Sequence, residues 1–230
     1  MPTPSQVAVA PSRHYGIYYS QRTTLVYAIV KRILDLAVAL IALIPLAPIM
    51  AVIAILVKRD SIGPALYRGE RAGRNGKPFE MLKFRTMVVN ADSIGGPSTS
   101  ADDSRITRVG HRLRRYKLDE LPQLINVLKG EMSLVGPRPE VMSEVRTYTA
   151  EERKLLSVPP GITDWASLRF SDEGAILEGA ADPHQVYLEK IRPEKVRLGL
   201  EYVQHRSLLV DLRVLADTAM VLLRTRTRLG

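Results

Sequence analysis

LAVALIALIPLAPIMAVIAILV, at residues 36–57, is the stretch of this 230-residue chain that restricts its fold most strongly. Its 22 residues are uncharged and almost wholly apolar. As one helix they would measure roughly 33 Å, enough to cross the hydrocarbon core of a bilayer. A cleaved signal peptide is a poor interpretation, because 35 residues precede the stretch and no small-residue cleavage site follows it. We expect this segment to lie in or on a membrane, with a buried core helix as the alternative.

Two prolines, Pro45 and Pro48, interrupt the apolar stretch near its middle. Each lacks a backbone N–H and clashes with the carbonyl four residues earlier, so the helix should bend or break there. Basic residues flank the stretch on both sides: Lys31 and Arg32 before it, Lys58 and Arg59 after it. The positive-inside tendency would place both ends on the cytoplasmic side. A proline-broken helix that re-enters the membrane fits both observations, and a kinked helix that spans the membrane remains the alternative.

The composition limits the chemistry of the chain. Hydrophobic residues make up 46% and charged residues 25% of the sequence, close to globular averages, which excludes wholesale disorder. The absence of cysteine excludes disulfides, thiolate nucleophiles and cysteine-based metal sites. With four scattered histidines, any metal would be a hard cation held by oxygen ligands.

Positive charge is concentrated in the first half of the chain. Residues 1–60 carry a net charge of +4 and residues 61–118 a net charge of +7, whereas residues 119–230 carry −2. This distribution suits an anionic partner such as phosphate groups, anionic lipid or nucleic acid.

Beyond the apolar stretch, the pattern predicts a single domain. Residues 1–24 have little periodicity and are expected to form a loose tail, which leaves residues 25–230 as the domain. Residues 65–87 predict a β-hairpin, because Asn75-Gly76 is a strong tight-turn signal between two strand-like runs.

Near the end of the chain, an apolar stripe repeats at three- and four-residue spacing: Leu208, Leu212, Leu215, Ala219 and Leu222. The stripe predicts an amphipathic helix. Such a helix either packs on the domain or lies on the membrane surface, and the sequence leaves both open.

KLDELPQLINVLKGEMSLVGPRPE, at residues 117–140, carries the chemistry. Pro122 suits the first residue of a short helix and Gly130 its stop. Asp119 and Glu120 then stand just before a helix N-terminus, where unpaired N–H groups and the helix dipole favour anions. Because aspartate is a favoured N-cap residue, plain capping is the alternative.

The surroundings of this carboxylate pair favour a site. Adjacent ionised carboxylates repel one another unless a cation stands beside them, and several arginines precede the pair in sequence. Arg138 follows in Gly-Pro-Arg-Pro, where two prolines stiffen the backbone. Carboxylates, guanidinium groups and a membrane segment together suit a phosphorylated, membrane-held substrate and a Mg²⁺ ion.

At these residues the chain strongly resembles the bacterial sugar transferases that are monotopic polyprenyl-phosphate phosphoglycosyl transferases. The matching pieces run in the family's order over about residues 30–223: KRILDLAVAL, the proline-broken run, GPALYRGERAGRNGKPFEMLKFRTM, LDELPQLINVLKGEMSLVGPRPE, PPGIT and LEYVQHRSLLVDL. The chain resembles the minimal catalytic form. The resemblance implies an α+β, mostly helical fold with a re-entrant membrane helix over about residues 30–58, a small hairpin and amphipathic surface helices.

The implied function is transfer of a sugar-1-phosphate from a UDP-sugar to undecaprenyl phosphate, which initiates exopolysaccharide, capsule, O-antigen or glycan assembly. The implied location of the protein is the cytoplasmic face of the bacterial inner membrane, in contact with the membrane lipid. The resemblance also implies a second copy of the chain and downstream glycosyltransferases as partners, and no nucleic acid.

The same motifs identify the site residues that the resemblance implies for this chain. Asp119 matches the family nucleophile, which would form a covalent phosphosugar-aspartate intermediate. Glu120 matches the second member of the dyad, and both carboxylates are the expected Mg²⁺ ligands. Basic residues that match or neighbour the expected phosphate-binding positions are Lys83, Arg85, Arg114 and Arg138. For Arg85, contact with lipid headgroups is the alternative.

The chain departs from the family pattern after PPGIT. Many members continue with Gly-Trp-Ala-Gln, whereas this chain reads Asp164-Trp165-Ala166-Ser167 and continues into an acidic stretch over residues 172–182. The departure leaves the choice of sugar open. Trp165 could stack on a ring, sit at the lipid interface or simply pack in the core.

Two other functions stay open at this point. A membrane-anchored basic adaptor would explain the charge but would leave LDELPQ and GPRP without a purpose. Direct attack of the lipid phosphate on the UDP-sugar would keep the reaction, with Asp119 as metal ligand or base.

Overall fold

The computed structural model of the chain describes residues 25–96 and 98–227, so the expected tail over residues 1–24 lies outside the described residues. The helices and helical turns are α1 (Leu25–Asp60), η1 (Arg74–Gly76), α2 (Ala91–Ile94), α3 (Arg108–Arg115), η2 (Leu118–Glu120), α4 (Gln123–Lys129), α5 (Met142–Arg146), η3 (Glu152–Ser157), α6 (Trp165–Arg169), α7 (Glu173–Leu177), α8 (Pro183–Val186), η4 (Tyr187–Ile191), α9 (Arg192–His205) and α10 (Leu208–Thr227). The strands are β1 (Leu66–Ala72), β2 (Pro78–Phe84), β3 (Ser133–Val135) and β4 (Gly161–Thr163). The expectation of a mostly helical fold with a small hairpin is confirmed.

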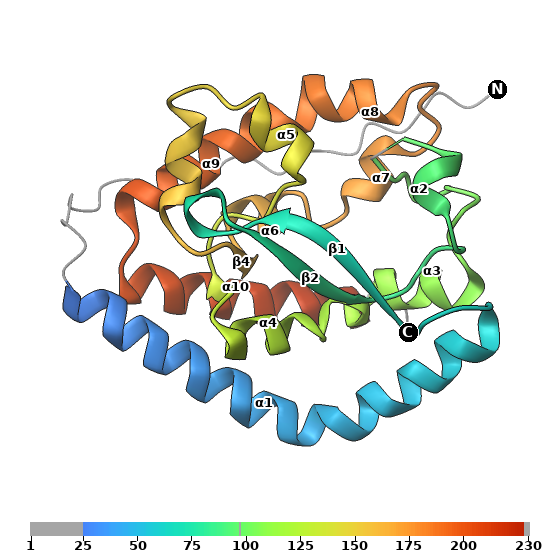
Figure 1. Cartoon of the computed structure of the whole chain (residues 1–230), viewed down its shortest axis with the longest axis horizontal. Coiled ribbons are helices and arrows are strands. Elements are labelled where there is room, and N and C mark those ends of the chain that lie inside the picture. The colour runs from blue at the N-terminus through green and yellow to red at the C-terminus, as the bar shows by residue number, and fades with distance from the viewer. Residues whose placement is uncertain (1–24, 97, 228–230) are drawn as a thin grey trace.

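Helix α1 runs without interruption over 36 residues, past both Pro45 and Pro48. Figure 1 shows it as a bow along the lower edge of the molecule, bent near its middle, with the other elements on its concave side. The two prolines remove two N–H donors and crowd the preceding turn, which bends the axis while the remaining hydrogen-bond ladder holds. The expected break is therefore a bend, and the helix extends beyond residues 30–58 at both ends.

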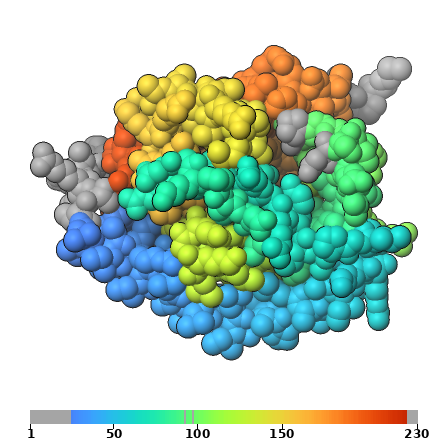
Figure 2. All heavy atoms as spheres, viewed as in Figure 1, coloured from blue at the N-terminus to red at the C-terminus, as the bar shows by residue number. Residues whose placement is uncertain are grey.

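Most apolar side chains of α1 are exposed. Its buried residues are Asp35, Ala39, Ile53 and Val57. Ile41, Ile44 and Val52 are each more than half exposed. Among the described residues, α1 is the one helix that is long and apolar enough to cross a membrane. A core helix would bury these side chains, so that alternative is wrong, and Figure 2 shows α1 lying at the surface.

Charged side chains tie the first turns of α1 to the body of the protein. The Arg32 guanidinium donates to the carbonyl oxygens of Val127 and the next residue at 2.6 and 3.0 Å, in the last turn of α4 where helix carbonyls lack intrahelical partners. The Asp35 carboxylate accepts hydrogen bonds from the Ser133 hydroxyl at 2.7 Å and from the Leu134 N–H at 3.2 Å, both in β3.

The last turn of α1 is tied to the same body. The Asp60 carboxylate accepts a hydrogen bond from the N–H of Val109, in the first turn of α3, at 2.9 Å. Arg85, which follows β2, donates to the carbonyl oxygen of Ser61 at 2.8 Å and to that of Ile62. Both ends of the bow are thus bonded to elements that lie on its concave side (Figure 1).

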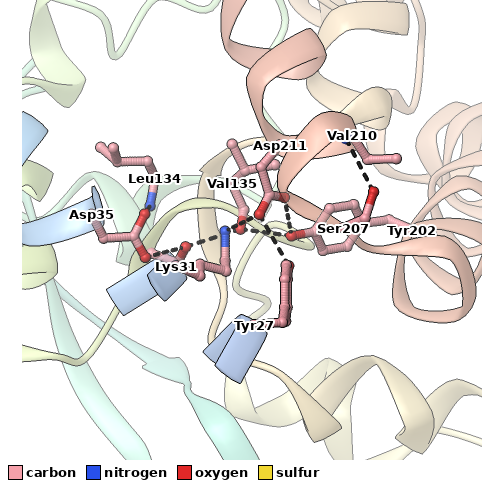
Figure 3. A network of polar contacts seen from close by, with 10 residues as sticks. Tyr27, Lys31, Asp35, Leu134, Val135, Tyr202, Ser207, Val210 and Asp211 are labelled. Atoms are coloured by element: carbon pink, nitrogen blue, oxygen red, sulfur yellow. Dashed lines mark hydrogen bonds and ion pairs between the residues drawn. The ribbon is translucent and has the colours of Figure 1, made fainter. Parts of the chain in front are cut away.

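A buried ion pair joins α1 to α10 (Figure 3). Lys31 Nζ lies 2.9 Å from Asp211 Oδ2, and the two side chains are 13% and 9% exposed. The hydroxyls of Tyr27 and Tyr202 donate to the same carboxylate at 3.0 and 2.7 Å. These partners meet the need of a buried carboxylate for a counter-charge and hydrogen bonds.

Helix α10 packs through a face other than the predicted stripe. Val210 and Val214 are buried, whereas Leu212 and Leu222 of the stripe are 57% and 42% exposed. The ion pair with α1 turns Asp211 inward, and the helical geometry turns the Leu212 side outward. One apolar face of α10 therefore packs on the domain, and a second apolar face is exposed.

Strands β1 and β2 form the expected hairpin. They pair antiparallel, from Leu66 opposite Phe84 to Ala72 opposite Pro78. Asn75 in the turn has a φ of 59°, in the left-handed region that asparagine adopts more readily than most residues. Strands β3 and β4 pair in parallel and form a second small sheet.

Asp211→Asn should destabilise the protein by about 3–5 kcal/mol, because it removes the ion-pair partner of the largely buried Lys31. Asp217→Asn on the same helix is the matched control, since the Asp217 carboxylate forms no ion pair within the described residues. It should change the free energy of unfolding by less than about 0.5 kcal/mol. Denaturant unfolding of both variants measures the difference, and equal effects would contradict the role of the pair.

Candidate active site

Asp119 and Glu120 lie in η2, a single turn between α3 and α4. Lys117 opens this turn with a φ of 55°, an uncommon backbone for a residue with a long side chain, which redirects the chain after α3. Pro122 occupies the N-cap of α4, and no side chain caps the helix. The capping alternative is therefore wrong. Gly130 ends α4 with a φ of 85°, as the sequence predicts.

Asn126 fixes α4 beside the hairpin. Its buried side chain accepts a hydrogen bond from the Leu82 N–H at 3.0 Å and donates to the Glu80 carbonyl at 2.7 Å. One amide thus pairs with both groups of the β2 backbone, as a neighbouring strand would. The contact holds the turn η2 next to Lys83, the following residue of β2.

Arg114 reaches the site through a close contact of α3. Its Nε donates to the hydroxyl of Thr86, just after β2, at 2.9 Å. A Cβ atom on Gly110 would lie 2.0 Å from the Thr86 carbonyl oxygen, so only glycine permits α3 to approach this closely.

Glu120 binds two of the predicted phosphate-binding cations. Its carboxylate lies 3.2 Å from Lys83 Nζ and is ion-paired with the Arg138 guanidinium. Burial alone would raise the pKa of Glu120, but the charges of Arg138 and Lys83 outweigh burial and hold that pKa well below its usual range. Glu120 is therefore a fixed negative charge that positions two cations.

Asp119 has a different environment, although it is the adjacent residue. It is 7% exposed, and its Oδ1 is buried without a hydrogen-bond partner among the described residues. Burial raises the pKa of the Asp119 carboxyl group above its usual range, and the Glu120 charge raises it further. The positive charge of Lys83 offsets part of this rise. The structure thus separates the two carboxylates into one that is paired and one that is not.

The other residues predicted to bind phosphate also differ in their environments. Burial lowers the pKa of the Lys83 ammonium, while the Glu120 charge opposes that shift. Arg85 lies apart from this group, because its guanidinium is bonded to the backbone carbonyls that follow α1. Lys83 and Arg138 are therefore brought to Glu120, Arg114 is held at Thr86 with its charge acting on Asp119, and Arg85 holds the end of α1.

A cavity of about 310 Å³ opens beside this group. Glu120, Arg138 and Lys117 line it, whereas Asp119, Lys83 and Arg114 do not. Apolar residues of α6 and α10 line one part of the wall, and polar residues of the segment 140–195 line another. The cavity thus offers both an apolar and a polar surface next to the Glu120–Arg138 pair.

Asp119 and Glu120 suit only a metal site in which substrate and water supply most of the ligands. The described residues contain no group of three or more Asp, Glu or His side chains that could hold a metal. Mg²⁺ is often held by one or two carboxylates, with substrate phosphates and water as its other ligands. The unpartnered Oδ1 of Asp119 fits that mode, whereas Glu120 already has two cationic partners.

Some residues of the site were not predicted from the sequence. Thr86 lies in the matched KFRTM segment but was not singled out as a site residue, and Glu140 and Lys195, far apart in sequence, come to one cavity only through packing of α9. The departure from the family pattern was the one available signal, since Asp164 and Ser167 both line the cavity. Trp165, in contrast, is buried edge-to-face on a tyrosine of α9, which is the packing role.

Most of the chain is similar to known proteins. A sequence model of the family described as bacterial sugar transferase matches residues 26–225. A UDP-glucose:undecaprenyl-phosphate glucose-1-phosphate transferase of Caulobacter vibrioides is 37% identical over 85% of this chain and 70% of its own length. A UDP-N-acetylgalactosamine-undecaprenyl-phosphate N-acetylgalactosaminephosphotransferase of Aeromonas hydrophila is 34% identical over 86% of this chain. A galactosyl transferase of Streptococcus agalactiae is also 34% identical over 86%. This chain spans 44% and 43% of the lengths of the latter two.

Asp119→Asn should stabilise the protein at neutral pH by about 1–3 kcal/mol, because it removes a buried charge that has no hydrogen-bond partner at Oδ1. Since the pKa of Asp119 is raised in the folded state, acid protonates the wild-type group and removes the same penalty. The gain should therefore shrink as the pH falls toward about 4, the usual aspartate range.

Denaturant unfolding at several pH values, without added metal, measures this gain. The control is Asp217→Asn, the same substitution on α10, which removes no ion pair within the described residues and should have little effect at any of these pH values. A variant at position 119 that is less stable than wild type at neutral pH would contradict the assignment of an unpaired buried charge.

Proposed function

The chain belongs to the bacterial sugar transferase family, and from this membership we propose that it transfers a sugar-1-phosphate from a UDP-sugar to undecaprenyl phosphate. The products are undecaprenyl-diphosphate-sugar and UMP, and the reaction initiates exopolysaccharide, capsule, O-antigen or glycan assembly. The names of the Caulobacter and Aeromonas relatives support the proposal, because they describe undecaprenyl-phosphate transferases with two different sugars. Family membership argues against a non-catalytic adaptor.

The observation that carries the proposal is the different pairing of two adjacent carboxylates. Glu120 is held by Lys83 and Arg138, whereas Asp119 keeps an oxygen without a partner. A carboxylate whose lone pairs are not taken by hydrogen bonds is the better nucleophile of the two. Arg138, which is fixed on Glu120 and lines the adjoining cavity, is then available to phosphate groups there.

In the proposed first step, the Asp119 carboxylate attacks the phosphorus that bears the sugar. A bond forms between the carboxylate oxygen and phosphorus, and the phosphoanhydride bond breaks so that UMP leaves with its electron pair. In the second step, an oxygen of undecaprenyl phosphate attacks the same phosphorus and releases the Asp119 carboxylate. The raised pKa of Asp119 means that attack requires a pH above that pKa.

Electrostatics decide whether an anion can attack a diphosphate. The planar guanidinium of Arg138 lines the cavity and suits two phosphate oxygens at once. Arg114 adds a second guanidinium beside Asp119. Asp119 is the residue that would hold Mg²⁺ together with phosphate oxygens and water, because Glu120 already has two cationic partners, and a bound Mg²⁺ would neutralise charge on the phosphates.

Direct transfer is the second candidate, and one observation favours it. Glu120 lines the cavity but Asp119 does not, and burial has raised the pKa of Asp119. In that route the lipid phosphate itself attacks the UDP-sugar, and Asp119 acts as a base or a metal ligand.

We also propose that α1 enters the cytoplasmic leaflet of the inner membrane and returns to the same side. Asp35 near its start and Asp60 at its end are both bonded to one body, on the concave side of the bow. The exposed apolar side chains lie between these ties. A helix that spans the bilayer would separate its two ends by the full membrane thickness, which these contacts oppose. The exposed Leu212 face of α10 would add a second contact with lipid.

Purified protein incubated with Mg²⁺ and a UDP-sugar, but no lipid acceptor, should gain the mass of one phosphosugar on Asp119. The reason is that the first step needs no lipid and releases UMP. Intact-mass spectrometry of protein in nanodiscs reads the adduct. Asp119→Asn should show no adduct and at least about 10³-fold lower turnover, while it stays membrane-bound.

Asp102→Asn is the matched control and should behave as wild type. If the wild type gains no adduct and releases UMP only when undecaprenyl phosphate is present, the result would favour direct transfer. Wild-type turnover in Asp119→Asn would remove the residue from the chemistry.

Reporter tags at residues 2 and 230 should both be found on the cytoplasmic side, because α1 re-enters the membrane. Protease or dye accessibility in spheroplasts measures this. A periplasmic signal from one tag alone would establish a spanning helix.

A further inference from the structure

One wall of the cavity is built from polar side chains that the proposed chemistry does not use. They lie on the loop between β3 and α5, on the segment that follows β4 and on α9: Glu140, Asp164, Ser167, Glu173 and Lys195. The volume of about 310 Å³ is within the range of small-molecule sites. We call these five residues the polar wall.

Ser167 and Asp164 come to the cavity as a pair. The Ser167 N–H donates to the Asp164 carboxylate at 2.7 Å, which caps α6 and places both side chains at the cavity. The Ser167 hydroxyl is buried and lies within reach of the same carboxylate. Because a hydroxyl both donates and accepts, Ser167 can bond a ligand in the cavity while it stays beside Asp164.

The rest of the polar wall is held rigidly. The Tyr187 hydroxyl donates to Glu140 at 3.2 Å, and Lys195 Nζ lies 2.5 Å from Glu173. The same ammonium stands 5.0 Å from the centre of the Tyr187 ring. Groups fixed by such contacts lose little conformational freedom when a ligand binds.

The charge of the polar wall identifies the kind of ligand. Three carboxylates lie near two cations: Lys195, which is paired with Glu173, and Arg138, whose charge acts on Glu140 and Asp164 as well as on Glu120. The carboxylates of the wall outnumber these cations, so an uncharged ligand suits it better than a phosphate group. Carboxylate, hydroxyl and ammonium groups at close quarters bind an uncharged ligand that has many hydroxyl groups, because each hydroxyl can donate and accept.

We propose that the polar wall binds the sugar ring of the UDP-sugar and that Ser167 and Asp164 select which sugar is accepted. This inference rests on the proposed function. It also accounts for the departure from the family pattern, because Asp164 and Ser167 stand where many members have glycine and glutamine. The named relatives carry different sugars in their names at 34–37% identity, so overall similarity does not determine the sugar.

Calorimetric titration tests the assignment independently of turnover. Protein in nanodiscs is titrated without Mg²⁺, so that the first step does not consume the donor, with UDP-glucose, UDP-galactose, UDP-N-acetylglucosamine, UDP-N-acetylgalactosamine and UDP alone. The wild type should distinguish the four donors. Ser167→Gln should weaken the preferred donor about 10-fold or change the preference, while its affinity for UDP changes less than about 2-fold.

Two further variants make the result interpretable. Ser167→Ala removes only the hydroxyl and should weaken the preferred donor about 3- to 10-fold, which decides the question if the glutamine variant fails to fold. Ser157→Gln, the same substitution at an exposed serine of η3 outside the cavity, should bind all five ligands as wild type does.

Equal weakening of UDP and the UDP-sugars would assign the wall to the nucleotide and overturn the proposal. Unchanged binding in both Ser167 variants, or a wild type that binds all five ligands alike or none, would also overturn it. UMP release with undecaprenyl phosphate and Mg²⁺ is measured on the same samples. Sugar-dependent binding that is lost at Ser167, without UMP release by the wild type, would retain the polar wall and reject the proposed transferase reaction.

Discussion

Three charged side chains on the first turns of an otherwise apolar helix organise this protein. Lys31 pairs with α10, Arg32 binds the end of α4 and Asp35 binds β3. Because most of α1 exposes apolar surface, these contacts act together with the few apolar side chains that it buries, Ala39, Ile53 and Val57, to fix its rotation relative to the body. Helix α4 follows directly on the turn that carries the two site carboxylates. The position of the candidate active site relative to the proposed membrane surface therefore depends on these polar contacts.

The C-terminal end of α1 constrains the positions of the cations of the site in the same way. Asp60 binds the start of α3, the helix that carries Arg114 at its other end, and Arg85 connects the end of β2 to the end of α1. Lys83 stands two residues before Arg85 on that strand. Each half of the bow thus positions one set of groups, the carboxylates through α4 and the cations through α3 and β2.

Local signals allowed the hairpin, the short helix α4 and its stop at Gly130 to be predicted, because each depends on backbone preferences of a few adjacent residues. The bend of α1 in place of a break, and the outward face of Leu212, depend on contacts between distant segments. The different environments of Asp119 and Glu120 could not be read from the sequence either, since partners from β2 and from the Gly-Pro-Arg-Pro segment create them. Arg85 carried the same signal as the phosphate-binding candidates, yet burial beside α1 gives it a structural contact.

The ion pair between Lys31 and Asp211 joins residues 180 positions apart. During synthesis Lys31 leaves the ribosome long before Asp211 is made. The ion pair between α1 and α10 can therefore form only after α10 has been synthesised. In that interval its charged turns have no protein partner, and water or lipid headgroups must solvate them. Closing this long loop gives the protein a high contact order, which slows folding and keeps apolar surface exposed meanwhile. Early insertion of α1 into the bilayer would protect the nascent chain from aggregation until the closing contact forms.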